Sequence, residues 1–264
     1  YPGMDLKLGD SDALVIAGST GLGKACASAF AREGANVAVC GRNAQRLEAA
    51  RESLNDAGTG SVLTAQADIT DPDELDAVVE EVTGDFGGLD HVVASAGAPA
   101  TKPFLDTTAR DWYATYDLLV MSVVWLAERA YPFLAESETG TLTAIASTDV
   151  REPVRGHVLS NAIRRSVLGL VKTLALEWAP DVRANAVLPG PHATPSLEAR
   201  LRDEVEREGY DSEEAALDAV RDEVPLGTVG DPEALGDLVA VLASERAAFV
   251  TGAAVPIDGG TLRS

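Results

Sequence analysis

Short apolar runs recur along the chain, separated by longer segments in which apolar residues return every three or four positions. The short runs are typical of buried strands, and the longer segments are typical of helices that bury one face. The predicted strands cover residues 13–17, 36–40, 61–66, 89–95, 141–146, 182–188 and 253–257. The predicted helices cover residues 22–33, 44–57, 71–85, 109–134, 159–178 and 232–244.

This alternation predicts an α/β fold in which a doubly wound parallel sheet of about seven strands carries helices on both faces. We expect one domain over residues 4–264, because the chain shows no internal repeat, low-complexity segment or linker. Residues 190–228 are polar, with an irregular and weakly helical pattern. We interpret them as an insertion that covers the carboxyl edge of the sheet as a substrate lid.

Composition narrows the class of protein. The 264 residues are 46% hydrophobic, which suffices for one large core. The longest apolar run, residues 118–127, is too short to cross a membrane, and no secretory signal precedes the first strand. Residues 1–3 precede Met4, and we interpret them as an expression scar. Cys26 and Cys40 are expected to be buried thiols in a reducing cytoplasm, and no residue spacing indicates a metal site.

The net charge of −21 is unusual, and only four of the 21 basic residues are lysines. The negative electrostatic field of such a chain disfavours binding to the phosphates of a nucleic acid. The acidic residues are spread over predicted helix surfaces, so they do not form a disordered tail. A uniformly acidic, lysine-poor surface is typical of proteins from a salt-loaded cytoplasm, where self-repulsion is screened. We therefore expect a cytoplasmic protein of a halophilic cell.

A glycine pair lies between the first predicted strand and the first predicted helix, at Gly21-Leu22-Gly23. Glycines at this point let backbone N–H groups approach a pyrophosphate, which then lies at the positive end of the helix. The loop therefore indicates dinucleotide binding.

Several segments together resemble the short-chain dehydrogenase/reductase (SDR) family, whose glycine loop reads TGxxxGxG. Here Ile16 and Ala17 replace the first Thr and Gly, and Gly18 stands one place late. The tail, from Pro225-Leu226-Gly227 to Asp258-Gly259-Gly260, is similar to the 3-oxoacyl-[acyl-carrier-protein] reductase branch. The resemblance covers residues 6–262 and implies a Rossmann-type fold. The cofactor-binding residues that it implies are Gly18, Ser19, Thr20, Gly21, Leu22, Gly23, Asp68, Ile69, Ser95, Ala96, Gly97, Arg164, Pro189, Gly190 and Thr194.

The second strand ends at Arg42. An acidic residue in this place would bind the ribose 2′-hydroxyl of NAD, whereas an arginine suits the 2′-phosphate of NADP. Arg42 therefore predicts that NADP(H) is preferred over NAD(H).

The resemblance also locates the catalytic positions, and most of them have changed. Ser147 matches the catalytic serine of the family, whereas Ser160 stands at the tyrosine, Arg164 at the lysine and Leu119 at the asparagine. A serine hydroxyl is far too weak an acid to replace a phenol. Arginine keeps the positive charge, so Arg164 can still grip ribose hydroxyls or a substrate carboxylate. Candidate proton sources are His157, with Tyr116 as an alternative, and water or the substrate itself, because a loop histidine is usually a solvated side chain and a helix tyrosine usually packs.

Two functions remain open at this point. The first is an NADP(H)-dependent oxidoreductase of a carbonyl/alcohol pair, similar to 3-oxoacyl reductases. The second is a catalytically quiet NADP(H)-binding sensor or partner subunit, favoured by the loss of three catalytic groups. A dehalogenase on the same scaffold fits poorly, because such enzymes keep the tyrosine and rebuild the glycine loop. Apolar helices at 109–134 and 159–178 predict a homotetramer, or at least a dimer, as in similar proteins.

Overall fold

The computed structural model describes the backbone of residues 5–263 and all of their side chains except those of 206–208. The expression scar expected at residues 1–3 lies outside this range. One sheet has the order β3-β2-β1-β4-β5-β6-β7, and every neighbouring pair is parallel. The predicted seven-stranded parallel sheet is confirmed. Its strands are β1 (Asp12–Ile16), β2 (Asn36–Gly41), β3 (Val62–Gln66), β4 (His91–Ala94), β5 (Thr141–Ile145), β6 (Arg183–Pro189) and β7 (Ala254–Ile257).

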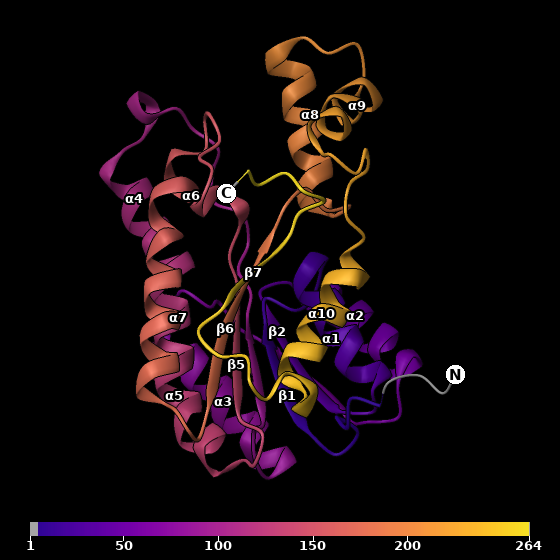
Figure 1. Cartoon of the computed structure of the whole chain (residues 1–264), viewed down its shortest axis with the longest axis vertical. Coiled ribbons are helices and arrows are strands. Elements are labelled where there is room, and N and C mark those ends of the chain that lie inside the picture. The colour runs from indigo at the N-terminus through magenta and orange to yellow at the C-terminus, as the bar shows by residue number, and fades with distance from the viewer. Residues whose placement is uncertain (1–4, 264) are drawn as a thin grey trace.

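Helices cover both faces of this sheet (Figure 1). One face carries α1 (Gly21–Arg32), α2 (Ala44–Ala57) and α10 (Pro232–Ala243). The other carries α3 (Pro72–Phe86), α5 (Ser122–Glu136) and α7 (Arg165–Glu177). Around the carboxyl edge lie α4 (Ala109–Tyr116), α6 (Val158–Ile163), α8 (Pro195–Glu208) and α9 (Glu213–Glu223).

Alternate residues of β1 supply two separate cores. Leu14 and Ile16 pack in the cluster formed with α3, α5 and α7, while Ala13 and Val15 pack in the cluster formed with α1, α2 and α10. Successive side chains of a strand point to opposite faces, so a strand between two helical layers must be apolar throughout. This is the physical origin of the uninterrupted apolar runs in the sequence.

The order of the strands reverses at β1, which pairs with β2 on one side and with β4 on the other. The connections that leave the carboxyl ends of β1 and β4 therefore diverge and open a crevice between them. In α/β sheets, ligands bind at such a point.

The expectation of an irregular segment at residues 190–228 is wrong in detail, because two regular helices, α8 and α9, occupy most of it. Thr194 and Ser212 cap these helices through their side chains, and Pro195 occupies the first turn of α8. Leu197, Leu201, Ala216 and Val220 form a small core between them. The pair stands above the carboxyl edge of the sheet (Figure 1).

The two long predicted helices also differ from the expectation. The stretch 109–136 contains a π-helical turn, Asp117–Met121, between α4 and α5, and the stretch 158–177 divides at Arg164 into α6 and α7. Residues 109–136 are long and apolar enough to cross a membrane by composition alone. However, Leu126, Ala130 and Leu134 pack fully buried in the core with the sheet.

The turn after β1 keeps a left-handed backbone without glycine, because Ala17 has a φ of 50°. A Cβ atom on Gly23 would lie 2.6 Å from the Ala17 carbonyl oxygen, so this turn packs directly on the start of α1. The left-handed conformation costs an alanine about 1 kcal/mol more than a glycine.

Ala17→Gly is therefore expected to raise the free energy of unfolding by about 1 kcal/mol, with a rise in Tm of about 2–4 °C. Thermal unfolding in molar KCl measures the change. The matched control is Ala96→Gly, a partly buried alanine against the same core whose φ is not positive. An equal loss of stability in both variants would show that the turn at Ala17 is not strained.

His91 begins β4 and is almost completely buried, with its ring stacked on Phe30 at a centroid distance of 5.6 Å. Its Nδ1 hydrogen-bonds with Thr141 Oγ1 at 2.9 Å, and its Nε2 has no partner within the described residues. Burial lowers the pKa of His91 to about 4; the charge of Asp90 opposes this shift and that of Arg183 adds to it.

Between about pH 6.5 and pH 4, the unfolded chain should bind a proton at His91 that the folded chain excludes. Stability contributed by His91 is thus lost as the pH falls through this window, by about 2 kcal/mol between pH 7 and pH 5. Denaturant unfolding at both pH values measures this loss, and His91→Gln should remove it. The same acid-induced loss in the variant would contradict the assignment to His91.

Candidate active site

The amino terminus of α1 opens onto the crevice without a side-chain cap. Thr20 is the N-cap residue, yet its hydroxyl makes no capping hydrogen bond, whereas Asn43 and Asp71 cap α2 and α3. The first turn of α1 also contains no acidic residue. Its backbone N–H groups and the positive end of its dipole are therefore available to an anion such as a pyrophosphate.

Arg42 and Asp68 meet at the neighbouring edge of the crevice, after β2 and β3. The Arg42 side chain is 77% exposed, and its Nη1 lies 3.7 Å from Asp68 Oδ2. Partial burial alone would raise the pKa of Asp68, but hydrogen bonds from Thr70 and the charge of Arg42 lower it overall. The two residues expected at the adenosine end of a dinucleotide thus lie together, with the guanidinium free to turn toward a phosphate.

The segments after β4 and β6 form the other side of the crevice. Ser95 is buried at the end of β4, followed by the partly exposed Ala96 and the exposed Gly97. The Gly190 N–H donates to the Ile257 carbonyl at 3.0 Å, which fixes the turn after β6 against β7. A Cβ atom on Gly21 would lie 3.9 Å from Thr194, so the glycine loop and this turn face each other. The structure therefore brings the predicted cofactor segments together.

A hydrogen-bonded cluster lies at the carboxyl end of β5. The backbone N–H of Asp149 donates to Ser147 Oγ at 3.2 Å. Ser160 Oγ donates to Asp149 Oδ2 at 3.2 Å, and His157 Nδ1 lies 3.3 Å from the same oxygen. Asn161 of α6 holds the intervening loop through two hydrogen bonds with the backbone of Val154. Three predicted catalytic residues, Ser147, His157 and Ser160, thus converge on Asp149.

Asp149 is a functional candidate that the sequence alone did not single out. Burial alone would raise its pKa, but hydrogen bonds from His157, Ser147 and Ser160 and the charge of His157 lower it overall. Asp149 therefore remains ionised under ordinary conditions. The available signal was its place two residues after Ser147, where a turn directs a side chain back toward α6.

Arg164 is buried at the junction of α6 and α7. Its Nη1 donates to the carbonyl oxygens of Ile145 at 3.4 Å and Ala146 at 3.2 Å, at the end of β5. Its Nε is buried without a partner in the described part of the chain. Burial lowers the pKa of Arg164, and the charge of Asp149 opposes this effect. Arg164 thus places an incompletely bonded cation beside Asp149.

Leu119 and Tyr116 do not contribute polar groups to this cluster. Leu119 is buried in the core within the π-helical turn. Tyr116 is 43% exposed, and within the described residues its hydroxyl makes no hydrogen bond to Ser147, Asp149 or His157. Sequence reasoning missed His192, which is buried after β6 and hydrogen-bonds the Gly190 carbonyl through Nδ1 at 3.0 Å.

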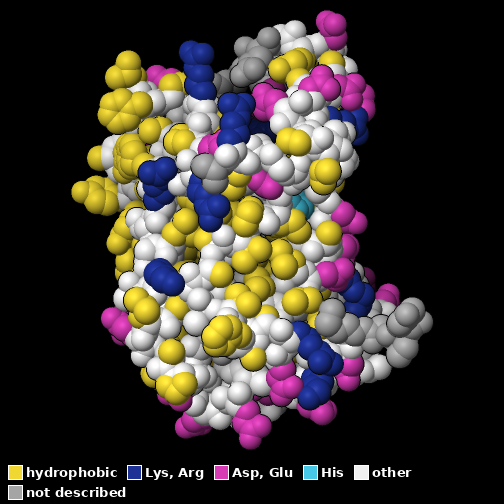
Figure 2. Space-filling view, viewed as in Figure 1, with side chains coloured by type: hydrophobic (Ala, Val, Ile, Leu, Met, Phe, Trp, Pro, Cys, Tyr) yellow, Lys and Arg dark blue, Asp and Glu magenta, His cyan; other side chains and the backbone are white. Residues whose placement is uncertain are grey.

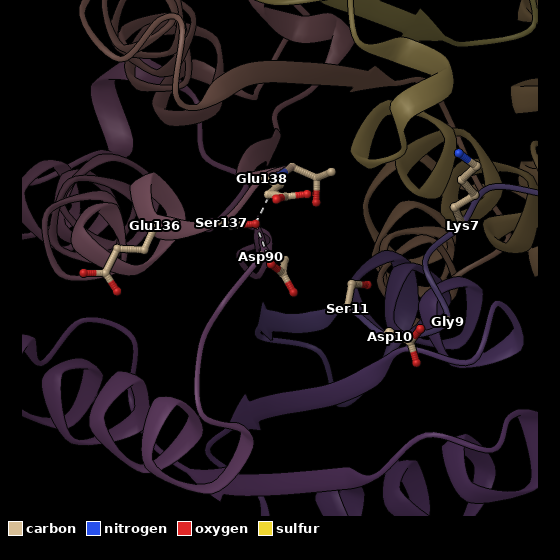
Figure 3. Close-up of a pocket in the computed structure, with 9 residues that line it drawn as sticks. Lys7, Gly9, Asp10, Ser11, Asp90, Glu136, Ser137 and Glu138 are labelled. Carbon is tan, nitrogen blue, oxygen red and sulfur yellow. Dashed lines mark hydrogen bonds between the residues drawn. The ribbon is translucent and has the colours of Figure 1, made fainter.

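A cavity of about 620 Å³ lies away from the crevice, at the amino ends of the strands (Figure 3). Its walls include Ser11, Asp90, Glu136 and Glu138, and the hydroxyl of Ser137 donates to Asp90. Ligands of α/β sheets bind at the opposite edge, so this cavity is not the active site. A smaller cavity of about 140 Å³ adjoins the turn after β6 and includes His192 and Gly230.

Comparison with known proteins agrees with this arrangement. Residues 16–261 match a family described as enoyl-(acyl carrier protein) reductase. A tropinone reductase homolog from Arabidopsis thaliana is 34% identical, over 94% of this chain and 89% of its own length.

Two solved structures extend the comparison. L-sorbose reductase from Gluconobacter frateurii, complexed with NADPH and L-sorbose, superposes with a TM-score of 0.94 and is 31% identical, over 99% of this chain and 100% of its own. A short chain oxidoreductase from Pseudomonas aeruginosa, with NADPH bound and an atypical catalytic center, has a TM-score of 0.87 and 27% identity, over 97% of this chain and 98% of its own.

The expected preference for NADP(H) is confirmed at the level of these relatives, both of which were solved with NADPH. The fold, the crevice and the matches over almost the whole length lead to one conclusion: this chain belongs to the short-chain dehydrogenase/reductase family of oxidoreductases.

Proposed function

We propose that this protein is an NADP(H)-dependent oxidoreductase that reduces a carbonyl group to an alcohol. The observation that carries the proposal is Arg42, an exposed guanidinium at the end of β2, where this fold reads the 2′-phosphate of NADP. The uncapped start of α1 suits the pyrophosphate of the same cofactor.

Bound NADPH supplies the hydride, and the protein supplies position and electrostatics. Ser147 Oγ accepts the Asp149 N–H, and its hydroxyl, which otherwise donates to the Asp149 carboxylate, would turn to hydrogen-bond a substrate carbonyl. Arg164 adds positive charge at the end of β5, where it would stabilise developing negative charge or hold ribose hydroxyls.

For the substrate, we propose a 3-oxoacyl compound. In the tail that resembles 3-oxoacyl reductases, Asp258 lies against the turn after β6, since a Cβ atom on Gly190 would touch it at 2.9 Å. The Leu226 N–H donates to the Gly259 carbonyl at 3.2 Å, which joins the two parts of the tail. The relative that binds L-sorbose supports reduction of a carbonyl group in general.

The second candidate function is that of a catalytically quiet NADP(H)-binding protein. One feature of the hydrogen-bonded cluster around Asp149 favours it. At the position of the family's phenol, Ser160 is a much weaker acid, and its hydroxyl donates to Asp149.

Arg42→Asp is expected to weaken NADPH binding at least tenfold, because it removes a charge-assisted hydrogen bond to the 2′-phosphate. NADH binding should be retained or improved. Fluorescence titration with each nucleotide in about 2 M KCl, a salt level chosen for the acidic surface, gives the two affinities. The matched control is Arg46→Asp, an exposed arginine one turn into α2. Equal losses in both variants would indicate a general charge effect and refute the 2′-phosphate assignment.

We also propose that the chain forms a homotetramer and belongs to a salt-adapted cell. Figure 2 shows apolar side chains gathered over the face that carries β7. Exposed large apolar residues include Phe104, Leu105 and Tyr113 around α4, and Phe249 just before β7. Buried between subunits, such residues would stabilise an assembly.

The net charge of −21 per chain should separate the subunits when salt is removed. Sedimentation velocity in about 2 M and about 0.05 M KCl, chosen to change screening strongly, is expected to show a tetramer in the first and smaller species in the second. A tetramer in both would disprove the role of screening, and a monomer in molar salt would disprove the assembly.

A further inference from the structure

Reduction of a carbonyl requires a proton for the oxygen, and Ser160 is too weak an acid to provide it. Histidine is the side chain that ordinarily titrates near neutrality. Of the three histidines, His91 is buried at the amino end of β4, and His192 is buried with Nδ1 on the Gly190 carbonyl. His157 alone lies in the cluster with Ser147 and Ser160 and remains partly exposed, at 20% of its side chain.

We propose that His157, held by the Asp149 carboxylate, donates the proton to the carbonyl oxygen that Ser147 binds; this assignment rests on the proposed reductase function. A carboxylate can only accept a hydrogen bond, so the 3.3 Å contact places a proton on His157 Nδ1. Nε2 makes no hydrogen bond within the described residues, and it is not sealed from solvent. The Nε2–H bond of the imidazolium is therefore available to a substrate.

Ser160 acts as a positioning residue in this arrangement. Its hydroxyl and the His157 imidazole both hydrogen-bond with Asp149 Oδ2, which fixes the carboxylate between them. The backbone N–H of Asp149 in turn orients Ser147 Oγ. A serine side chain also ends well short of where a tyrosine hydroxyl would lie, which leaves the place of the usual acid to another group. The same carboxylate thus connects the proton donor to the residue that binds the substrate.

The proton and electrons balance in one step. The carbonyl carbon receives a hydride, with both electrons, from the reduced nicotinamide dinucleotide. The His157 Nε2–H bond breaks as the O–H bond of the alcohol forms, and neutral imidazole remains with Nδ1–H on Asp149. Solvent then returns a proton to Nε2.

The charged groups around His157 favour this cycle. Asp149 is the carboxylate that contacts it, and the Arg164 cation interacts electrostatically with that same carboxylate. Lys102 and His157 form an isolated parallel β-bridge. The Lys102 ammonium, however, forms a salt bridge with Asp111 of α4, with Nζ 2.9 Å from Oδ1. Arg151 and Arg155 of the same loop are exposed, so solvent screens them.

The test compares His157→Gln, Asp149→Asn and Ser160→Ala with the control Glu152→Gln. Glu152 belongs to the same loop but accepts a hydrogen bond from the Arg263 backbone. Two readouts are collected in about 2 M KCl, the salt level chosen for the acidic surface. The first is NADPH affinity by fluorescence. The second is the pH profile of kcat/KM with acetoacetyl-coenzyme A and L-sorbose as carbonyl probes.

We expect the wild-type rate to fall as the pH rises, because the step consumes a proton, and we expect Glu152→Gln to show the same pH profile. His157→Gln should lose about 100-fold in kcat and its pH-dependent limb, and Asp149→Asn and Ser160→Ala should lose less. All variants should bind NADPH normally. His157→Gly should regain rate when imidazole is added, which a merely structural role does not predict.

Two negative outcomes are distinct. Wild-type rate and pH profile retained in His157→Gln would overturn the proton-donor assignment and leave the proposed function intact. A wild-type protein that binds NADPH but reduces neither probe would overturn the proposed function, and the proton-donor assignment with it.

Discussion

The parallel pairing of β1 with β4 is the constraint on which the rest of the molecule depends. Because these strands are neighbours in space but not in sequence, the chain must cross over through β2 and β3 before it returns. The crossovers place every strand's carboxyl end at one edge and divide the helices between two faces. The glycine loop, Arg42, the Asp149 cluster and the turn after β6 therefore meet at one crevice, although they span residues 17 to 194.

Much of this fold could be predicted from the sequence, because strands buried on both faces must be apolar throughout. The bounds of α2 agree with the prediction at both ends, and the strands differ by only a few residues. The failures have physical causes. In α8 and α9 the apolar residues are few and contact mainly each other, so the segment is polar overall and was interpreted as irregular. At Arg164, where the helix divides, the side chain donates to carbonyl groups at the end of β5, a long-range contact that no local sequence pattern records.

The sequence predicted which residues belong to the candidate site, but it did not predict which of them contact one another. Sequence spacing placed Ser147, Ser160 and Arg164, but their roles depend on Asp149, whose hydrogen bonds join a turn after β5 to α6. The contact between His157 and Asp149 likewise depends on how Asn161 folds the loop between them. In the mechanism that we propose, a carboxylate-held imidazole takes the place of the phenol on the same scaffold.

The separate core of α8 and α9 has a consequence for catalytic turnover. Because Leu197, Leu201, Ala216 and Val220 pack with one another and not with the sheet, displacing the helix pair exposes little of either main core. We propose that the pair swings as a rigid body about its two connections, while the glycine loop and the Asp149 cluster stay fixed. Product release would then set its own rate, governed by a hinge and not by the stability of the domain.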